Sequence, residues 1–313
     1  MSTDFDIADL VYGRVVFVTG KGGVGKTSVS AALARLAAAQ GRRVLLVEVD
    51  SQRSALSPLF GVDVGYEPVK AADNLWLCNI DWYNALHEWI ERVVPSRRVV
   101  DLILDNRIVR LFLDATPGNR EVVTLSKICW LKPDYDLVVI DLPASGHATA
   151  LMHSPGRTLE LFRVGPIYQR SLESQALLHA EGTHLVLVAL PEEMVVNETV
   201  ETWRKLNRQV PKLSVPLVVL NRASRPSLSA DERLLLQRLS EARGEEGSEA
   251  ELLLAGRWES RLEVATGRAM ERVEREIPIS LIDVPRLSQE KGAAHLVHNL
   301  AAALARRSRR GLT

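Results

Sequence analysis

The residues from Gly20 to Ser28 read GKGGVGKTS, a pattern suited to binding the phosphates of a nucleotide. They match G-x-x-x-x-G-K-[ST] and stand directly after an apolar run and before a segment of helical composition, which argues against a chance glycine-rich turn. Backbone N–H groups would surround the phosphates, Lys26 would reach the β and γ oxygens, and the Thr27 hydroxyl would ligate Mg²⁺. The segment predicted to bind Mg-ATP comprises Gly20, Lys21, Gly22, Gly23, Val24, Gly25, Lys26, Thr27 and Ser28.

Two aspartates end apolar runs and are the candidates for metal and water chemistry. Asp50 ends RVLLVEVD, and Asp141 lies in DLVVIDLP. Because the carboxyl ends of parallel strands meet at one edge of a sheet, both carboxylates are expected beside the phosphate loop. Asp141 is predicted to hold Mg²⁺ together with Thr27. Asp50 is predicted to orient the attacking water and is counted with the metal set; a structural strand-end Asp is the alternative.

The elements that must position these groups are apolar, β-rich runs separated by helical stretches. Most runs are almost continuously hydrophobic, which is typical of central strands covered by helices on both faces. We predict an α/β fold with a doubly wound, mostly parallel sheet, as in P-loop nucleoside triphosphatases. The predicted strands are RVVFVTG from Arg14, RVLLVEVD from Arg43, NLWLCNI from Asn74, DLVVIDLP from Asp136, HLVLVALP from His184, PLVVLNRA from Pro216 and IPISLIDVP from Ile277.

Three helical segments interrupt this alternation within a predicted single domain, residues 1–313. Residues 82–131 and 155–182 are too long for ordinary crossovers and are predicted to form an inserted helical subdomain beside the sheet. Residues 227–276 are charged and are predicted to be solvated amphipathic helices around an acidic, glycine-containing link.

The composition excludes several classes of protein. Lys plus Arg and Asp plus Glu both number 39, so the strong net field of a non-specific nucleic-acid binder is absent. No apolar run has the length of a membrane span, and the N-terminal residues do not resemble a signal peptide, so a cytoplasmic location is expected. Cys78 and Cys129 form no CxxC motif, which argues against a disulfide framework or a zinc site.

A second lysine in the phosphate loop carries a resemblance to a known group of proteins. KGGVGKT, with Lys21 ahead of Lys26, resembles the deviant Walker A form of the ArsA, MinD and ParA group of SIMIBI-like ATPases. In that group the additional lysine contacts the nucleotide of the partner subunit, so the resemblance implies a catalytic role for Lys21 beside Lys26. It also implies a nucleotide-sandwich homodimer, or a heterodimer with a related ATPase. A solvated loop lysine is the alternative interpretation.

The segments after the two aspartates resemble the switch regions of the ArsA-like family. DLPASGH, from Asp141 to His147, is similar to the switch II signature D-T-A-P-T-G-H, which makes His147 a switch residue rather than a base. The switch I form D-P-A-H-[NS] is altered, because residues 51–53 read SQR although Asp50 and Ser54 remain. The resemblance implies ATP hydrolysis, while the altered switch I leaves open a slow or regulatory partner of an active paralogue.

The resemblance also assigns residues around the base of ATP. Asn221 ends PLVVLN at the position where this family reads the adenine edge, and an amide can donate and accept at once. An Asn at a strand end is also a common turn residue. Val284 and Pro285 belong to a segment that resembles the loop closing over the base.

The resemblance spans nearly the whole chain and implies an ATP-driven switch that captures or targets a protein client, as in the bacterial single-domain branch. The paired CxxC motifs of targeting dimers and a cysteine cluster for arsenite are missing, so arsenical transport is disfavoured. The helical insert would supply an apolar groove, unless its residues pack in the core. These residues are Trp82, Tyr83, Leu86, Trp89, Ile90, Val93, Leu102, Ile103, Val109, Leu111 and Phe112.

A spatial organiser of the MinD or ParA kind is the alternative from a different class. Such a protein uses ATP-dependent dimerisation to hold itself on membrane or DNA. The support in this chain is a terminal basic cluster suited to anionic lipid or phosphate. The cluster comprises Arg306, Arg307, Arg309 and Arg310, which could equally be a solvated helix end.

Overall fold

The computed structural model describes residues 5–94, 96, 98, 100, 106–107, 118–224, 226–242, 248–287 and 292–307. The strands are β1 Val15–Gly20, β2 Val44–Val49, β3 Val69–Ala72, β4 Leu75–Ile80, β5 Leu137–Asp141, β6 Thr183–Ala189, β7 Ser214–Ala223 and β8 Ser280–Pro285. The helices include α1 Ile7–Val11, α2 Lys26–Ala39, α3 Leu56–Phe60, α4 Trp82–Val93, α7 Asn119–Leu131, the 3₁₀ helix η1 Lys132–Asp134, α8 Ser145–Leu161, α9 Pro166–His179, α10 Glu193–Gln209, α11 Ala230–Ala242, α12 Ser248–Glu276 and α13 Ala293–Arg307.

The eight strands form one sheet in the order β3-β4-β2-β5-β1-β6-β7-β8. Every neighbouring pair is parallel except β3 and β4, which are antiparallel. The predicted α/β fold with a doubly wound, mostly parallel sheet is therefore confirmed. Sequence reasoning found seven strands and missed β3, a four-residue edge strand whose side chains alternate between half-buried and exposed.

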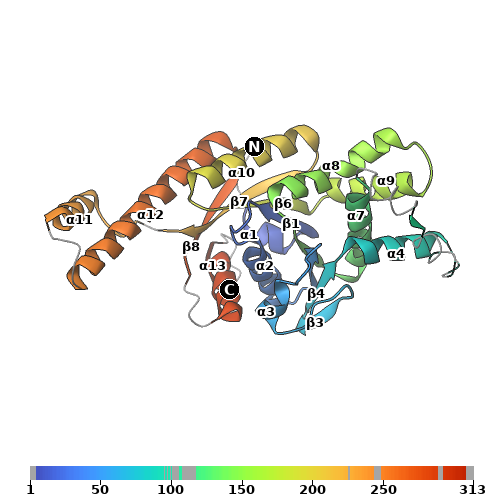
Figure 1. The fold of residues 1–313 in the computed structure, drawn as a ribbon, viewed down its shortest axis with the longest axis horizontal. Helices are drawn as coiled ribbons and strands as arrows, with labels where there is room; N and C mark the ends of the chain where they lie inside the picture. Colours follow the sequence, from blue (N-terminus) through green and yellow to red (C-terminus); the bar gives the residue numbers. More distant parts are fainter. Residues whose placement is uncertain are drawn as a thin grey trace.

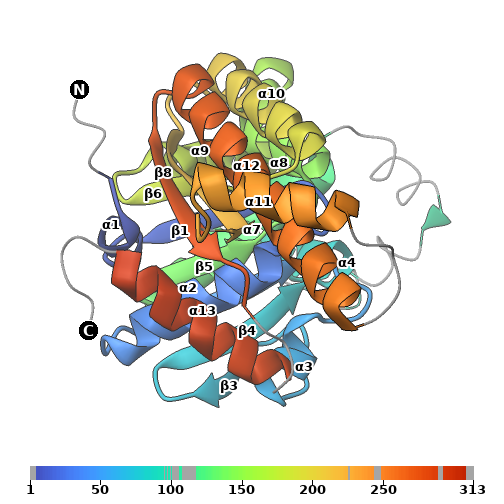
Figure 2. The ribbon, with the colours of Figure 1, turned by 90° about the vertical axis from the view of Figure 1, so that its left-hand side faces the viewer.

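The central strands are covered on both faces. Every residue of β1, β2 and β5 is buried, which explains why their sequences are continuously apolar rather than alternating. Figure 2 shows α2 and α13 on one face of the sheet and α8, α9 and α10 on the other. This arrangement places the carboxyl ends of β1, β2 and β5 at a common edge, where the candidate residues lie.

Helices α4, α7, α8 and α9 pack on one another at one end of the molecule, on the right in Figure 1. Most of the segment between α4 and α7 lies outside the described residues, including five apolar candidates at positions 102, 103, 109, 111 and 112. The second excursion differs from the prediction, because α8 begins at Ser145 and contains Pro155 within it. Proline is unfavourable inside a helix, so a helix that continues through Pro155 is not expected from its sequence.

The charged segment forms the helices α11 and α12, which extend away from the sheet on the left of Figure 1. The two helices are joined to each other by the carboxylate of Glu263 in α12, whose side chain is fully buried. This carboxylate accepts hydrogen bonds from the backbone N–H of Ser227 at 2.7 Å and pairs with Arg233 at 3.2 Å. The link to the sheet is a separate bond, because the backbone N–H of Ser224, which directly follows β7, donates to the Thr266 hydroxyl of α12 at 3.0 Å.

A buried lysine joins α4 to α7. Lys127 is 3% exposed, and its ammonium lies 2.7 Å from the Glu88 carboxylate and 4.3 Å from the centre of the Tyr66 ring. Glu88 also accepts from the Tyr66 hydroxyl at 2.6 Å and from Arg92 at 2.7 Å. These donors hold the pKa of Glu88 below its usual value although burial acts to raise it. The cluster ties the helical layer to the loop that precedes β3.

Replacing Glu88 by Gln is expected to lower the free energy of unfolding by about 3 kcal/mol, because the Lys127 ammonium is left buried without its charged partner. Urea unfolding would measure the loss, and the double variant Glu88→Gln/Lys127→Met should recover much of it. Glu91→Gln on the same helix changes a partly exposed carboxylate that lies 3.7 Å from His87 Nδ1 and is the control. Equal effects of the two single variants would contradict the assignment.

Candidate phosphate-binding site

The phosphate loop connects the end of β1 to the start of α2. Gly20, the last residue of β1, has φ +155°, and a Cβ atom there would lie 2.1 Å from the Val188 carbonyl oxygen of β6. Gly25, the residue before α2, has φ +93°, and no side chain caps the helix. The first N–H groups of α2 are therefore left for a ligand, as an anion site at a helix N-terminus requires.

The predicted metal residues Thr27 and Asp141 are in direct contact. The Thr27 hydroxyl donates to Asp141 Oδ2 at 2.5 Å, and Ser30 donates to Oδ1 at 3.4 Å. Asp141 is 7% exposed, and burial raises its pKa to about 6 although Thr27 and Lys26 act to lower it. A hydroxyl and a carboxylate are oxygen ligands of the kind that Mg²⁺ takes beside nucleotide phosphates, so these residues fit the ion.

Lys26 spans the loop in which it lies. Its ammonium donates to the backbone carbonyl of Lys21 at 3.2 Å. Burial lowers the pKa of Lys26, and the negative charges of Asp141 and Glu198 oppose the shift. A phosphate would add negative charge beside this ammonium and favour its protonated form.

Lys21 faces a carboxylate that sequence reasoning missed. Its ammonium lies 3.7 Å from Glu198 Oε2 of α10, and the other oxygen of Glu198 accepts from the Ser145 hydroxyl at 2.5 Å. Ser145 is the first residue of α8, in the predicted switch II segment, and His147 is exposed two residues later. Glu198 thus connects the phosphate loop to switch II. One polar residue in an amphipathic helix gives no local signal for such a role.

Asp50 is bonded to the helical layer in this structure. The backbone of Asp50 has φ +52°. Its Oδ1 atom accepts a hydrogen bond at 3.0 Å from the backbone N–H of Trp82, the first residue of α4. Burial of the carboxyl raises the pKa of Asp50, while Trp82 and Arg120 act to lower it. The contacts described for Asp50 therefore do not bring it to Lys26, Thr27 or Asp141. Its roles toward water and metal stay predictions.

Switch I is organised by a second carboxylate that sequence reasoning missed. Glu48, in β2, is 3% exposed and accepts from the Ser51 hydroxyl at 3.1 Å, the Ser54 hydroxyl at 2.5 Å and the Ala55 N–H at 2.8 Å. These bonds shape the turn that follows Asp50. The signal in the sequence is a lone acidic residue within an otherwise apolar strand, which indicates a buried carboxylate with partners.

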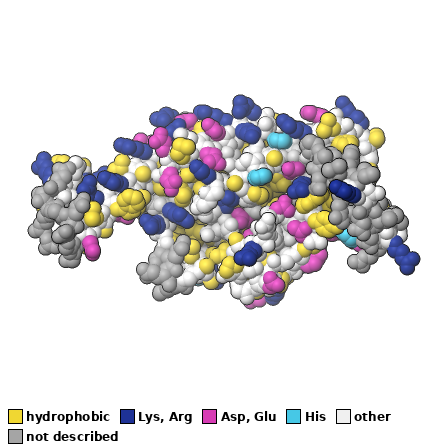
Figure 3. Space-filling view, in the orientation of Figure 1, with side chains coloured by type: hydrophobic (Ala, Val, Ile, Leu, Met, Phe, Trp, Pro, Cys, Tyr) yellow, Lys and Arg dark blue, Asp and Glu magenta, His cyan; other side chains and the backbone are white. Residues whose placement is uncertain are grey.

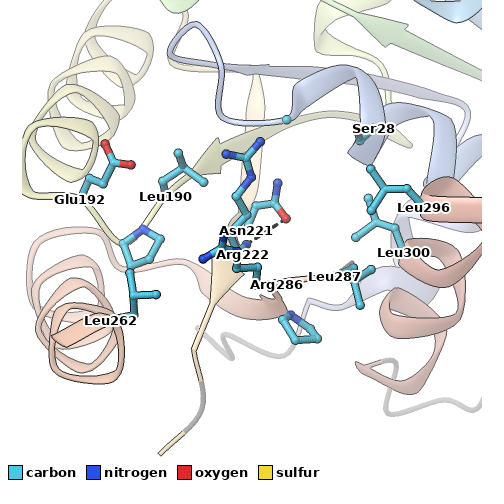
Figure 4. A pocket seen from close by; sticks show the side chains of 13 residues that line it. Ser28, Leu190, Glu192, Asn221, Arg222, Leu262, Arg286, Leu287, Leu296 and Leu300 are labelled. Carbon is cyan, nitrogen blue, oxygen red and sulfur yellow. Dashed lines mark hydrogen bonds between the residues drawn. The ribbon is translucent and has the colours of Figure 1, made fainter. Parts of the chain in front are cut away.

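A cavity of about 680 Å³ lies beside the phosphate loop. Of the residues predicted around the base, Asn221 and Pro285 line it, whereas Val284 is fully buried in the core. Figure 4 shows Asn221 and Arg222 from β7 in the middle of the cavity, with Leu262 of α12 on one side and Leu296 and Leu300 of α13 on the other. The lining residues are Gly25, Ser28, Leu190, Pro191, Glu192, Asn221, Arg222, Leu262, Pro285, Arg286, Leu287, Leu296 and Leu300. The walls combine leucine and proline side chains with the charged groups of Glu192, Arg222 and Arg286, so they offer both apolar and polar contacts to a heterocyclic base.

The raised pKa of Asp141 predicts a pH dependence of stability. The proton binds more tightly in the folded state, so its contribution to stability is present below about pH 4 and is lost as the pH rises through about 6. At pH 8 without metal, Asp141→Asn should raise the free energy of unfolding by about 2 kcal/mol, and the gain should vanish near pH 4. Urea unfolding in a chelator measures this. Equal pH profiles for the wild type and the variant would refute it, and the exposed Asp134→Asn is the control.

The Glu198 contact predicts the behaviour of the switch II helix. Glu198→Ala removes the acceptor of the Ser145 hydroxyl, so amide exchange in the first turn of α8 should quicken on the order of tenfold. Hydrogen exchange followed by mass spectrometry measures this directly. Glu201→Ala, at an exposed position of the same helix, should leave the turn unchanged. Unaltered exchange in Glu198→Ala would show that the carboxylate does not hold the switch.

Comparison with known proteins identifies the family of this chain. The sequence model of the anion-transporting ATPase family matches residues 13–174, slightly more than half of the chain. The ATPase BagA of Mycobacterium tuberculosis is 31% identical over 223 residues, which cover 67% of this chain and 65% of that protein. The arsenical pump-driving ATPases of Escherichia coli and Acidiphilium multivorum are each 29% identical over 61% of this chain, and the matched part is 36% of their length. This chain belongs to the anion-transporting ATPase family.

Proposed function

We propose that this protein binds Mg-ATP, hydrolyses it to ADP and phosphate, and works as a dimeric switch. The observation that carries the proposal is the contact of Thr27 with Asp141 beneath an uncapped helix N-terminus. Family membership and the ATPase names of the relatives support hydrolysis. The chain spans only about two thirds or less of the length of these relatives, so its activity rests on the proposal.

The residues of this chain divide the proposed chemistry among them. The loop amides and Lys26 bind the phosphates, and Thr27 and Asp141 hold Mg²⁺, which neutralises charge on the phosphate oxygens. Asp50 orients the attacking water once its carboxylate leaves the Trp82 N–H. The switch therefore connects the water site to the start of α4.

Lys21 is the proposed contribution of one subunit to the nucleotide of the other. Its side chain is 39% exposed, and its pair with Glu198, at 3.7 Å, is a partly exposed ion pair. Such pairs contribute little stability, so the ammonium can exchange Glu198 for phosphates of a partner-bound nucleotide at small cost. The same geometry serves a homodimer or a heterodimer with a related ATPase.

Capture of a protein client stays a proposal. The exposed apolar side chains of α11 and α12 support a client-binding surface on these two helices. In α4, Leu86 and Ile90 are buried, which supports the core-packing alternative for them, whereas Tyr83 and Val93 are exposed. More exposed large hydrophobic side chains lie on α11 and α12: Leu234, Leu235, Leu239, Leu252, Leu254, Trp258 and Val264. Helices that are anchored beside the cavity and carry apolar side chains suit a client whose binding depends on nucleotide.

The described residues give no comparable support to the alternative of a spatial organiser that binds membrane or DNA. Arg307 is paired with Asp283, and Arg309 and Arg310 lie outside the described residues. Positive and negative side chains are mixed over the face drawn in Figure 3. Within the described part of the chain, no helix has the length and apolar character to cross a bilayer. A cytoplasmic location stays a prediction.

The two cysteines argue against a soft-ligand site for arsenite. Cys78 is buried in β4 and Cys129 lies in α7. Burial raises the pKa of both thiols to about 12, so neither supplies a thiolate readily. The arsenical names belong to the relatives, and arsenite is not part of the function proposed for this chain.

Phosphate release from Mg-ATP by the purified chain tests the proposal. Asp50→Asn should lower turnover by at least about tenfold, because the attacking water loses its hydrogen-bond acceptor. Lys21→Ala should abolish the ATP-dependent dimer, which sedimentation measures, and should spare much of ATP binding by the monomer. Lys70→Ala, which changes an exposed lysine in β3, is the control. Turnover equal in the wild type and Asp50→Asn would overturn the role of Asp50. Normal dimeric turnover in Lys21→Ala would reject the lysine acting across the interface.

A further inference from the structure

The Asn221 side chain connects the cavity to the phosphate loop. Its Nδ2 atom donates to the backbone carbonyl of Val24 at 2.8 Å. Both residues are buried, with 7% of Asn221 and none of Val24 exposed. Val24 lies in the middle of the loop, so this bond holds the segment that carries the phosphate-binding amides. A hydrogen bond shielded from water is costly to break, because the carbonyl would be left unsatisfied.

The amide packs against the loop too closely for any side chain between them. A Cβ atom at Gly25 would lie 2.4 Å from Asn221 Nδ2, and Gly25 has φ +93°. Glycine is therefore required here for close approach as well as for its backbone conformation. The distance also means that the loop cannot shift toward β7 without displacing the amide.

An irregularity in β7 fixes the plane of the same amide. The register between β7 and β8 shifts between Leu220 and Ala223, and Arg222 has φ +55°. The Arg222 backbone N–H donates to Asn221 Oδ1 at 3.0 Å. The amide is held at its nitrogen by the phosphate loop and at its oxygen by the strand. Its orientation is thus set before any ligand arrives.

The amide keeps bonding capacity for a ligand in the cavity that it lines. An Asn side chain has two N–H donors and two acceptor lone pairs, and the bonds to Val24 and Arg222 use one of each. A heterocycle with adjacent donor and acceptor groups would use the others. Such a ligand would restrain the plane of the amide, and with it the bond to Val24.

We propose that Asn221 is a positioning residue of the phosphate loop, through which a base in the cavity stabilises the loop conformation that binds phosphates. This inference rests on the proposed nucleotide binding and adds to it a coupling between the two halves of the ligand. Base and phosphates bind cooperatively because one side chain contacts both subsites.

Inorganic tripolyphosphate, which has no base, isolates the loop from the base contact. Calorimetry with Mg²⁺ should show that Asn221→Ala and Asn221→Asp each weaken tripolyphosphate binding on the order of tenfold. The loss should be larger in Asn221→Asp, because a carboxylate oxygen would then face the Val24 carbonyl oxygen. Leu262→Ala shortens a cavity wall on α12 away from the loop and is the matched control. It should weaken ATP binding and spare tripolyphosphate binding.

Two further readouts separate positioning from general stabilisation. Binding is measured well below the thermal midpoint of each variant, where a side chain that only stabilises the fold would leave the affinity of the folded protein unchanged. In the free protein, loop amides 22–28 should exchange faster in Asn221→Ala than in the wild type or Leu262→Ala.

Unchanged tripolyphosphate affinity, or unchanged loop exchange where tripolyphosphate binds too weakly to measure, would overturn this inference alone. Wild-type protein that binds no Mg-ATP would overturn the proposed function itself.

Discussion

The contact between the Thr27 hydroxyl and the Asp141 carboxylate is the constraint on which the site depends. It joins the first turn of α2 to the end of β5, and so fixes where the phosphate loop ends relative to the sheet edge. The carboxylate is almost fully buried, which explains why its pKa is raised and why it needs a hydroxyl, a nearby ammonium or a cation to remain charged. Its burial follows from its place in β5, every residue of which is buried.

Three other carboxylates accept hydrogen bonds from the segments around the site. Glu48 shapes switch I, Glu198 joins the phosphate loop to switch II, and Asp50 bonds to the start of α4. Glu48 acts within a single turn, whereas Glu198 and Asp50 join segments that are distant in sequence. In the proposed switch, these are the contacts that bound phosphates would have to change.

Local patterns predicted the fold and the position of the glycine-rich loop between a strand and a helix. Continuous apolar runs identified seven of the eight strands, and Lys26 and Thr27 begin the helix that was expected after the loop. Their roles toward a nucleotide stay predictions. The contacts of Asn221 with Val24 and of Glu198 with Lys21 could not be predicted, because each spans well over a hundred residues and leaves no periodic signal. The start of α8 was misplaced for another reason: Pro155 is accommodated inside a helix that packs against α7 and α9.

The two borders of the sheet limit how separate molecules can join. β3 is only four residues long and carries Lys70, while β8 ends in Pro285 and contacts α13. Short length, a charged side chain and a proline all discourage the backbone of another chain from extending a sheet. Neither border offers a long template for a ninth strand. The proposed dimer would therefore form through matched side-chain surfaces, and such contacts can be made and broken without disrupting a strand.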